Sequence, residues 1–310
     1  AQEAGAPREV LRVGNGDKEA VDAILHDARV QAVSFVGSTP IAEYIYRTGT
    51  SNDKRVQALG GAKNHMIVMP DADVSHVRDA LIGSAFGSAG ERCMAVSVAV
   101  CVGKETADSV RDAVSEAAQK LNVGPYTDGD ADFGPLSSEI HMNKVVSYID
   151  KGVAEGADLV VDGRNLNLQG YEKGYFVGPT VFDRVTSDMT IYKEEIFGPV
   201  LGIVRCSSYS DAVSLVDNHE LGNGAALFTN DGGVSRHFVE KTQIGMVGVN
   251  VPIPVPVAYH SFGGWKRSLF GDHHMHGPEG IRFYTKLKTA TIAWPAGANT
   301  GPEFSIPVLS

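Results

Sequence analysis

Short apolar runs alternate with amphipathic stretches along most of the chain, and this alternation is typical of an α/β protein. Strands are predicted where apolar residues run together, and helices where they recur every three or four positions. The predicted strands cover Gln31–Val36, His65–Met69, Val96–Val102, Leu159–Val161, Val177–Phe182, Val200–Arg205, Gly224–Thr229, Met246–Asn250 and Lys286–Trp294. The predicted helices cover residues 39–47, Asp73–Ser88, Glu105–Leu121, Ile140–Glu155, Ser210–Asn218 and Gly233–Thr242.

Proline and glycine divide this pattern. The stretch Val251–Val257 has a proline at every second position, so it is predicted to be an extended loop, because proline cannot join a central strand ladder. The turn Gly60-Gly61 is the best internal boundary, and the chain contains no internal repeat. A chain of 310 residues is long enough for about two domains.

Composition and charge exclude several classes of function. The net charge is −10 and the sequence pI about 5.4, which argues against binding to nucleic acid or to an anionic membrane surface. No apolar run approaches the length of a membrane span. The polar start Ala1–Glu9 lacks an initiator methionine and an apolar leader, so we expect no signal peptide and a fragment of a longer chain.

The chain has three cysteines, at positions 93, 101 and 206. So sparse and odd a set indicates free thiols in a reducing compartment, which we expect to be the cytoplasm, or the mitochondrial matrix in a eukaryote. Cys101 lies within a predicted apolar strand and is expected in the core, and Cys206 ends a strand without supporting neighbours. Cys93 differs, because Gly87 and Gly90 precede it and Arg92 is adjacent.

Cys93 is therefore the candidate nucleophile. A thiolate is the reactive form of cysteine, and a nearby cation such as Arg92 is expected to lower the thiol pKa. The glycines would let the backbone approach a ligand closely. The residues alone leave an alternative open, since a free cysteine at the start of a core strand is often buried and inert.

Two further segments are candidates for ligand binding. In Phe35-Val-Gly37-Ser38-Thr39 a strand runs directly into a helix, whose first N–H groups and dipole suit a phosphate. Most α/β proteins have several such turns, so this feature alone is not specific. The segment Lys193–Pro199 offers Glu195, which could accept the hydroxyls of a ribose, and Phe197, which could pack on a planar ring. The alternative for its two glutamates is a solvated acidic turn.

A histidine-rich run, Asp272-His273-His274-Met275-His276, raises the possibility of a metal site. No cysteine or carboxylate accompanies it at a clear ligand spacing, so we expect a polar surface loop and no metal.

Six motifs in a fixed order resemble the aldehyde dehydrogenase superfamily, and the likeness covers nearly the whole chain. They are Phe35-Val-Gly-Ser-Thr39, Leu59-Gly-Gly61, Gly90-Glu-Arg-Cys93, Glu194-Glu-Ile-Phe-Gly-Pro199, Gly222-Asn-Gly224 and Ser261-Phe-Gly-Gly-Trp-Lys266. Within the family, the chain is similar to the CoA-acylating methylmalonate-semialdehyde dehydrogenase branch over Val56–His65, Gly248–Pro256 and Ser261–Asp272.

This resemblance implies an aldehyde dehydrogenase fold, with a Rossmann-like cofactor domain remnant, an α/β catalytic domain and a C-terminal oligomerisation strand. Residues 1–60 would be the C-terminal part of an NAD-binding domain and residues 61–270 the catalytic domain. Residues 271–310 would be a return segment with the oligomerisation strand and tail. Lys288–Pro295 matches the strand that joins a neighbouring subunit's sheet in the family, so a homo-oligomer, dimer or tetramer, is expected.

The resemblance also assigns roles to individual residues. It makes Cys93 the catalytic nucleophile. The residues implied to bind NAD are Gly37, Ser38 and Thr39 along its phosphate and ribose path, Gly60 beside the nicotinamide, Glu195 at the nicotinamide ribose and Phe197 against the ring. The longer N-terminal region of family members, which carries most of the dinucleotide-binding sheet, has no counterpart before Gly37.

Two positions narrow the expected chemistry. Hydrolytic family members carry a water-activating Glu just before Leu-Gly-Gly, where this chain has Ala58. Loss of a general base costs a factor of about a hundred or more, so a thiol such as CoA could take over deacylation. Arg92 would suit bidentate binding of a substrate carboxylate, or would instead brace the loop.

The expected function is NAD-dependent, CoA-acylating oxidation of methylmalonate or malonate semialdehyde to propanoyl-CoA or acetyl-CoA with loss of CO2, as in valine, pyrimidine or inositol breakdown. The alternatives are a hydrolytic aldehyde dehydrogenase that makes a free acid, and an inactive truncated remnant with a binding or oligomeric role. A cysteine hydrolase is disfavoured, because no motif supplies a histidine partner for Cys93.

Overall fold

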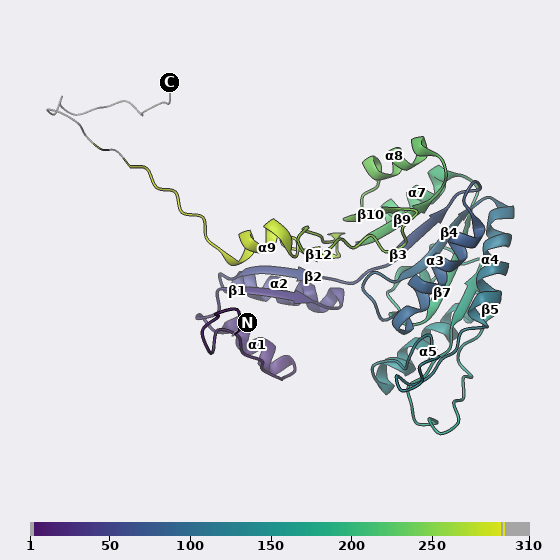
Figure 1. The fold of residues 1–310 in the computed structure, drawn as a ribbon, viewed down its shortest axis with the longest axis horizontal. Helices are drawn as coiled ribbons and strands as arrows, with labels where there is room; N and C mark the ends of the chain where they lie inside the picture. Colours follow the sequence, from purple (N-terminus) through teal and green to yellow (C-terminus); the bar gives the residue numbers. More distant parts are fainter. Residues whose placement is uncertain (1–2, 293, 295–310) are drawn as a thin grey trace.

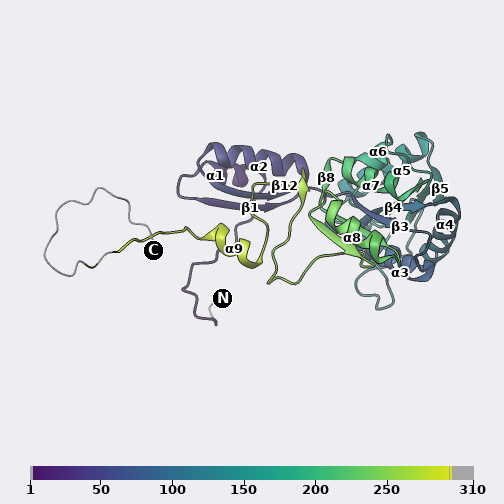
Figure 2. The same cartoon turned by 90° about the horizontal axis from the view of Figure 1, so that it is seen from above.

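The computed structural model describes residues 3–292 and 294. These residues form two lobes, each built around its own β-sheet and connected through a narrow waist (Figures 1 and 2). The small lobe contains α1 (Lys18–His26), β1 (Ala32–Val36), α2 (Thr39–Ser51), β2 (Arg55–Leu59), β12 (Leu269–Phe270) and α9 (Gly277–Tyr284). Both lobes combine helices with strands, which confirms the predicted α/β class.

The sheet of the small lobe has the strand order β1-β2-β12. Strands β1 and β2 are parallel, and β12 is antiparallel to β2. Helices α1 and α2 lie on one side of this sheet and α9 on the other (Figure 2). The lobe's core is small and consists of Leu25, Ala42, Ile45, Val56 and Ala58.

The large lobe is built on a seven-stranded sheet with the order β10-β9-β3-β4-β7-β6-β5. All neighbouring strands are parallel except β5, which is antiparallel to β6. The strands are β3 (Asn64–Val68), β4 (Val96–Val102), β5 (Asp158–Val161), β6 (Thr180–Asp183), β7 (Val200–Cys206), β9 (Gly224–Phe228) and β10 (Met246–Val249). A short ladder pairs β8 (Leu221–Gly222) with β11 (Trp265–Lys266).

Helices cover this sheet, and most begin at a capping side chain. They are α3 (Val74–Phe86), the short 3₁₀ turn η1 (Gly87–Gly90), α4 (Lys104–Ala118), α5 (Glu139–Ala154), α6 (Thr190–Lys193), α7 (Tyr209–Asn218) and α8 (Gly232–Lys241). Asp73, Ser138 and Asp231 accept hydrogen bonds from the first backbone N–H groups of α3, α5 and α8. Strand β4 is buried along nearly its whole length, as expected of a parallel strand packed on both faces.

The predicted elements of the large lobe are confirmed in position, with ends shifted by up to three residues. Cys101 is confirmed as a core residue of β4, and the proline-rich loop forms no strand. The structure adds α1, β2 and α9, which the sequence pattern did not predict. Residues 286–292 and 294 of the predicted strand Lys286–Trp294 pair with no strand of the same chain. A strand needs a partner, and the partner expected from the family resemblance belongs to a neighbouring subunit.

The chain passes between the lobes at Gly60–Lys63 and again just before β12. Ser268, which is fully buried, joins the two passages: its carbonyl accepts from Gly60 N at 3.0 Å, and its hydroxyl donates to Gly61 O at 2.6 Å. Lys266 fastens the returning segment to the large lobe, because its Nζ donates to three carbonyls at the C-terminal end of α7. The waist is therefore cross-linked by hydrogen bonds as well as by the chain segments that run through it.

The core of the small lobe generates a stability prediction. Ile45 and Ile41 lie one turn apart on α2, but Ile45 is 1% exposed and Ile41 is 49% exposed. Ile45→Ala should destabilise the small lobe by about 2–5 kcal/mol, and Ile41→Ala by about 1 kcal/mol or less. Hydrogen exchange of the β1 and β2 amides measures the difference. Equal acceleration by both variants would contradict the assigned core.

Candidate active site

Cys93 lies at the end of a tightly wound loop that connects α3 to β4. Ser88, Ala89 and Gly90 all have positive φ, which is uncommon for residues with a side chain. Only glycine fits at position 90, because a Cβ there would lie 2.2 Å from the carbonyl oxygen of Gly198. This close contact places the loop against the segment that carries Glu195. The Cys93 side chain remains exposed to solvent.

The loop is fixed through the backbone of Cys93. Its carbonyl oxygen accepts a hydrogen bond from Asn64 Nδ2 at 2.9 Å and another from Asn223 Nδ2 at 3.1 Å. Asn64 also bonds to the Ala95 carbonyl and accepts from the backbone N–H of Gly224. Both asparagines are buried, so these bonds are shielded from competing water. The sequence analysis gave neither asparagine a role, although Asn223 lies within the motif Gly222-Asn-Gly224.

Arg92 is exposed and folds back over its own loop. Its Nε donates to Ser88 Oγ at 3.1 Å, and its NH1 group points to the carbonyl of Gly83 in α3, at 3.4 Å. These contacts correspond to the bracing role that the sequence left open. The guanidinium is directed away from the thiol in this arrangement.

The expectation that a cation lowers the thiol pKa is wrong in this structure. Desolvation by the surrounding walls and the carboxylate of Glu195 together raise the pKa of Cys93. The backbone N–H of Cys93 opposes this effect only in part. Because Arg92 points toward α3, the nearest influential charge is negative. The thiol therefore needs a more alkaline solution, or a change in its surroundings, to become a thiolate.

Glu195 faces the first passage between the lobes. Its Oε1 accepts from the backbone N–H of Ala62 at 2.9 Å, and its Oε2 lies so close to Gly61 that a Cβ there would be 2.4 Å away. On the other side of Gly61, the Thr39 hydroxyl accepts from Gly61 N at 2.9 Å. Burial raises the pKa of Glu195, while the Ala62 N–H and the charge of Lys63 lower it.

The structure thus brings most of the predicted site residues into two adjoining groups. Cys93, Arg92, Glu195 and Phe197 line one cleft, together with Gly90, Asn64 and Gly198 among others. The second group comprises Thr39, Gly60 and Glu195, which meet around Gly61. Gly37 donates to the carbonyl of Leu59 at 3.0 Å, and Ser38 is the N-cap of α2, with Pro40 in the helix's first turn.

Phe197 is held in an unusual conformation. Its φ is +60°, in the left-handed region that phenylalanine rarely adopts, and its carbonyl contacts His141 Nε2 at 2.6 Å. His141 Nε2 also lies 3.3 Å from Glu91 Oε1. Glu91 in turn accepts from Ser137, so the residues beside Cys93 and Phe197 are both tied to the start of α5.

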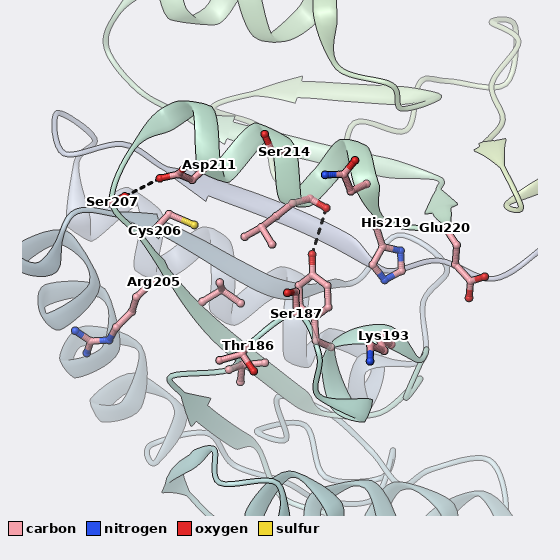
Figure 3. A pocket seen from close by; sticks show the side chains of 15 residues that line it. Thr186, Ser187, Lys193, Arg205, Cys206, Ser207, Asp211, Ser214, His219 and Glu220 are labelled. Carbon is pink, nitrogen blue, oxygen red and sulfur yellow. Dashed lines mark hydrogen bonds between the residues drawn. The ribbon is translucent and has the colours of Figure 1, made fainter.

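A larger cavity, of about 760 Å3, lies between α6, β7 and α7 (Figure 3). His219, Cys206 and Lys193 project around it, and Cys93 is not among its lining residues. Burial raises the pKa of Cys206 to about 11, which disfavours a reactive thiolate there. Chemistry, and not cavity size, therefore selects the Cys93 cleft as the candidate active site.

No helix among residues 3–292 and 294 is long and apolar enough to span a membrane. In the same part of the chain, no group of three or more His, Cys, Asp or Glu side chains is arranged to hold a metal ion. Within the histidine-rich run, His273 contacts Glu279 at 3.0 Å.

The charge beside Cys93 generates a second prediction. Glu195→Gln removes the carboxylate that raises the thiol pKa, so the pKa of Cys93 should fall. Iodoacetamide should then alkylate Cys93 about two- to tenfold faster at neutral pH, since the thiolate is the reactive form. The rate is measured against pH, and Cys93→Ser gives the background from the other two thiols.

The matched control is Glu194→Gln. Glu194 is the adjacent carboxylate, but it is exposed and accepts a 2.5 Å hydrogen bond from Tyr148. Its removal should leave the alkylation profile of Cys93 unchanged. A profile shifted equally by both variants would contradict the specific influence of Glu195.

Comparison with known proteins agrees with the geometry. The family model for the aldehyde dehydrogenase family matches residues 1–290. The malonate-semialdehyde dehydrogenase of Pseudomonas aeruginosa is 57% identical over 308 residues, which are 99% of this chain and 62% of that protein. The corresponding enzyme of Halalkalibacterium halodurans is 47% identical over 292 residues, or 94% of this chain and 60% of that protein.

Two solved structures are also similar. The methylmalonate-semialdehyde dehydrogenase of Oceanimonas doudoroffii has a TM-score of 0.94 and 60% identity, covering 96% of this chain and 61% of its own. An aldehyde dehydrogenase of Mycobacterium tuberculosis, solved with NAD+, has a TM-score of 0.85 and 30% identity, covering 91% and 57%. The chain thus spans about three fifths of the length of these relatives. The resemblance seen in the ordered motifs is confirmed, and the chain belongs to the aldehyde dehydrogenase family.

Proposed function

We propose that this chain supports NAD-dependent, CoA-acylating oxidation of malonate or methylmalonate semialdehyde, with Cys93 as the nucleophile. The observation that carries the proposal is the shared cleft of Cys93 and Glu195 in a chain that has Ala58 where hydrolytic relatives have a base. The names of its relatives favour the same substrate class. We place this activity in a reducing compartment, in keeping with three free thiols.

The residues present are suited to hold NAD. Helix α2 has three and a half turns, and Gly37, Ser38 and Thr39 stand at its N-terminus, where backbone N–H groups favour a phosphate. Gly60 and Gly61 keep the passage between Thr39 and Glu195 free of side chains. Glu195 is half-buried, so its carboxylate can accept ribose hydroxyls, and Phe197 lines the same cleft as Cys93.

Cys93 performs the covalent chemistry in this proposal. Its thiol loses a proton, and the thiolate sulfur bonds to the aldehyde carbon, whose oxygen takes the negative charge. Bound NAD would supply the hydride acceptor for that carbon, and Cys93 would then carry the acyl group as a thioester. The bond to the substrate's β-carboxylate then breaks and CO2 leaves, because the thioester stabilises the resulting enolate. The enolate takes up a proton at carbon, and addition of water to CO2 would give bicarbonate.

Release of the acyl group distinguishes this reaction from hydrolysis. Ala58 is fully buried in β2, where it pairs with Phe35 and Phe270, so position 58 offers water no carboxylate. The CoA thiolate attacks the thioester carbon and forms acetyl-CoA or propanoyl-CoA, and the sulfur of Cys93 leaves as thiolate. Arg92 would bind the substrate carboxylate after turning away from Ser88.

The proposal also includes association with further copies of the chain. By family resemblance, the segment from Lys288 would add a strand to a neighbouring subunit, giving a dimer or a tetramer. In the described part of this segment, Ile292 is 70% exposed and Trp294 is 87% exposed. Such apolar side chains in extended backbone suit strand addition.

The test of function is an assay of this chain with malonate semialdehyde and NAD, with and without CoA. We expect NADH and acetyl-CoA in the presence of CoA, and at least a hundredfold slower turnover without it, since no base replaces the thiol nucleophile. Equal turnover in both conditions, with accumulation of free acid, would identify a hydrolytic enzyme. Absence of both turnover and saturable NAD binding in calorimetry would identify an inactive remnant.

Arg92 gives a separate prediction. Arg92→Ala should lower kcat/KM for malonate semialdehyde by about 10- to 100-fold, the value of a lost charge-assisted hydrogen bond. The loss with propanal, which has no carboxylate, should be about threefold or less. Arg92→Lys keeps the charge but not the bidentate geometry, so its kcat/KM for malonate semialdehyde should lie between those of wild type and Arg92→Ala. Equal losses on both aldehydes would show that Arg92 only braces the loop.

A further inference from the structure

Three consecutive residues, Ala62, Lys63 and Asn64, reach both halves of the candidate active site. The backbone N–H of Ala62 binds the Glu195 carboxylate, and the Asn64 side chain binds the carbonyl of Cys93. Lys63 lies between them, at the entry to β3. Successive side chains of an extended segment point to opposite sides. Residues 62–64 therefore connect, through only three residues of backbone, the N–H group that binds Glu195 to the amide that binds the Cys93 carbonyl.

Lys63 is unusual among the lysines of the large lobe because it is only 3% exposed. Its Nζ donates to the carbonyls of Ile191 at 2.7 Å and Glu194 at 2.8 Å. Ile191 belongs to α6, and Glu194 immediately precedes Glu195. Lys63 thus binds the backbone on the N-terminal side of Glu195, and one of its two acceptors belongs to the residue just before Glu195.

Burial disfavours the charged form of Lys63. It lowers the pKa of Lys63 to about 7, against the opposing influence of the Glu195 and Glu194 charges. A neutral amine has two N–H bonds and an ammonium has three, so either form can donate to both carbonyls. Both hydrogen bonds can therefore form in either protonation state, and the charged donor makes the stronger ones.

Residues 190–195 depend on contacts with the interior of the large lobe to hold their conformation. Helix α6 is a single turn, too short to be stable by itself, and one of its sides forms a wall of the cavity between α6 and α7 (Figure 3). From the inner side it is held by Lys63 and by a 3.0 Å contact between Tyr192 OH and His65 Nε2. Glu195 extends from this short, partly supported turn.

We propose that Lys63 and Asn64 are a positioning pair: Lys63 sets the place of Glu195, and Asn64 sets the place of the Cys93 loop. The Lys63 half rests on the proposed function, in which Glu195 binds the ribose of NAD. Neither side chain touches the reacting atoms. Their consecutive attachment to β3 fixes the nucleophile and the cofactor carboxylate relative to one another.

The experiment compares Lys63→Met with Lys54→Met. Lys54 is the matched control: it is 5% exposed, and its Nζ also donates to two carbonyls, those of Asp27 and Val30, in the small lobe. Lys63→Met should weaken NAD binding about tenfold in calorimetry and accelerate hydrogen exchange of peptides spanning residues 190–197. Lys54→Met should change neither, although both variants lose the same kind of buried bonds.

Asn64 is tested through the thiol. Asn64→Ala should change the rate of Cys93 alkylation about threefold or more at neutral pH while leaving exchange of residues 190–197 as in wild type. Asn223→Ala, which removes the other donor to the Cys93 carbonyl, should act in the same direction. Lys63→Met should have a smaller effect on alkylation than either asparagine variant.

The outcomes separate this inference from the proposed function. In one outcome, wild type binds NAD, and Lys63→Met has the same NAD affinity and the same hydrogen exchange of residues 190–197 as Lys54→Met. The positioning role of Lys63 is then overturned, and the proposed function stands. If wild type binds no NAD, the function falls together with the cofactor half of the inference. Exchange of residues 190–197 and alkylation of Cys93 still decide the structural roles of Lys63 and Asn64.

Discussion

The passage of the chain from the small sheet to the large one, at Gly60–Asn64, is the constraint on which the candidate site depends. Each of these five residues commits at least one polar group to a partner from a different part of the chain. The partners include the end of the small-lobe sheet, the segment before β7 and the loop before β4. A nucleophile on one element and a carboxylate on another are brought within one cleft because both are held to this passage.

This arrangement carries an electrostatic cost. Burial raises the pKa of Glu195, and burial together with the nearby Glu195 carboxylate raises the pKa of Cys93. Lys63 offsets part of the cost for Glu195, while Arg92 contributes nothing comparable to the thiol. An arriving ligand that hydrogen-bonds to Glu195, or draws its charge away, would favour the thiolate. If Glu195 holds the cofactor as proposed, ligand binding and nucleophile activation would be coupled through a single carboxylate.

The sequence predicted what local pattern and motif order encode. Periodicity located most elements of the large lobe, and the ordered motifs identified the family and the candidate nucleophile. Lys63 and Asn64 escaped notice because their roles depend on carbonyls that lie about 30 to 130 residues away in the chain. Strand β2 was missed for a related reason: its buried Gln57 looks like a surface residue until it meets the carbonyls of His273 and His274. The direction of Arg92 likewise follows from α3, not from its adjacency to Cys93.

Strand β12 has a consequence for how the protein is made. Leu269 and Phe270 pair with Leu59 and Ala58, so the sheet of the small lobe is closed by residues that leave the ribosome about 210 positions after the strand they cover. Until then β2 presents an open edge, which is a template for pairing with other chains. The large lobe must meanwhile assemble around this unfinished neighbour. Pairing of β12 with β2 is therefore a late, non-local step in the folding of the small lobe.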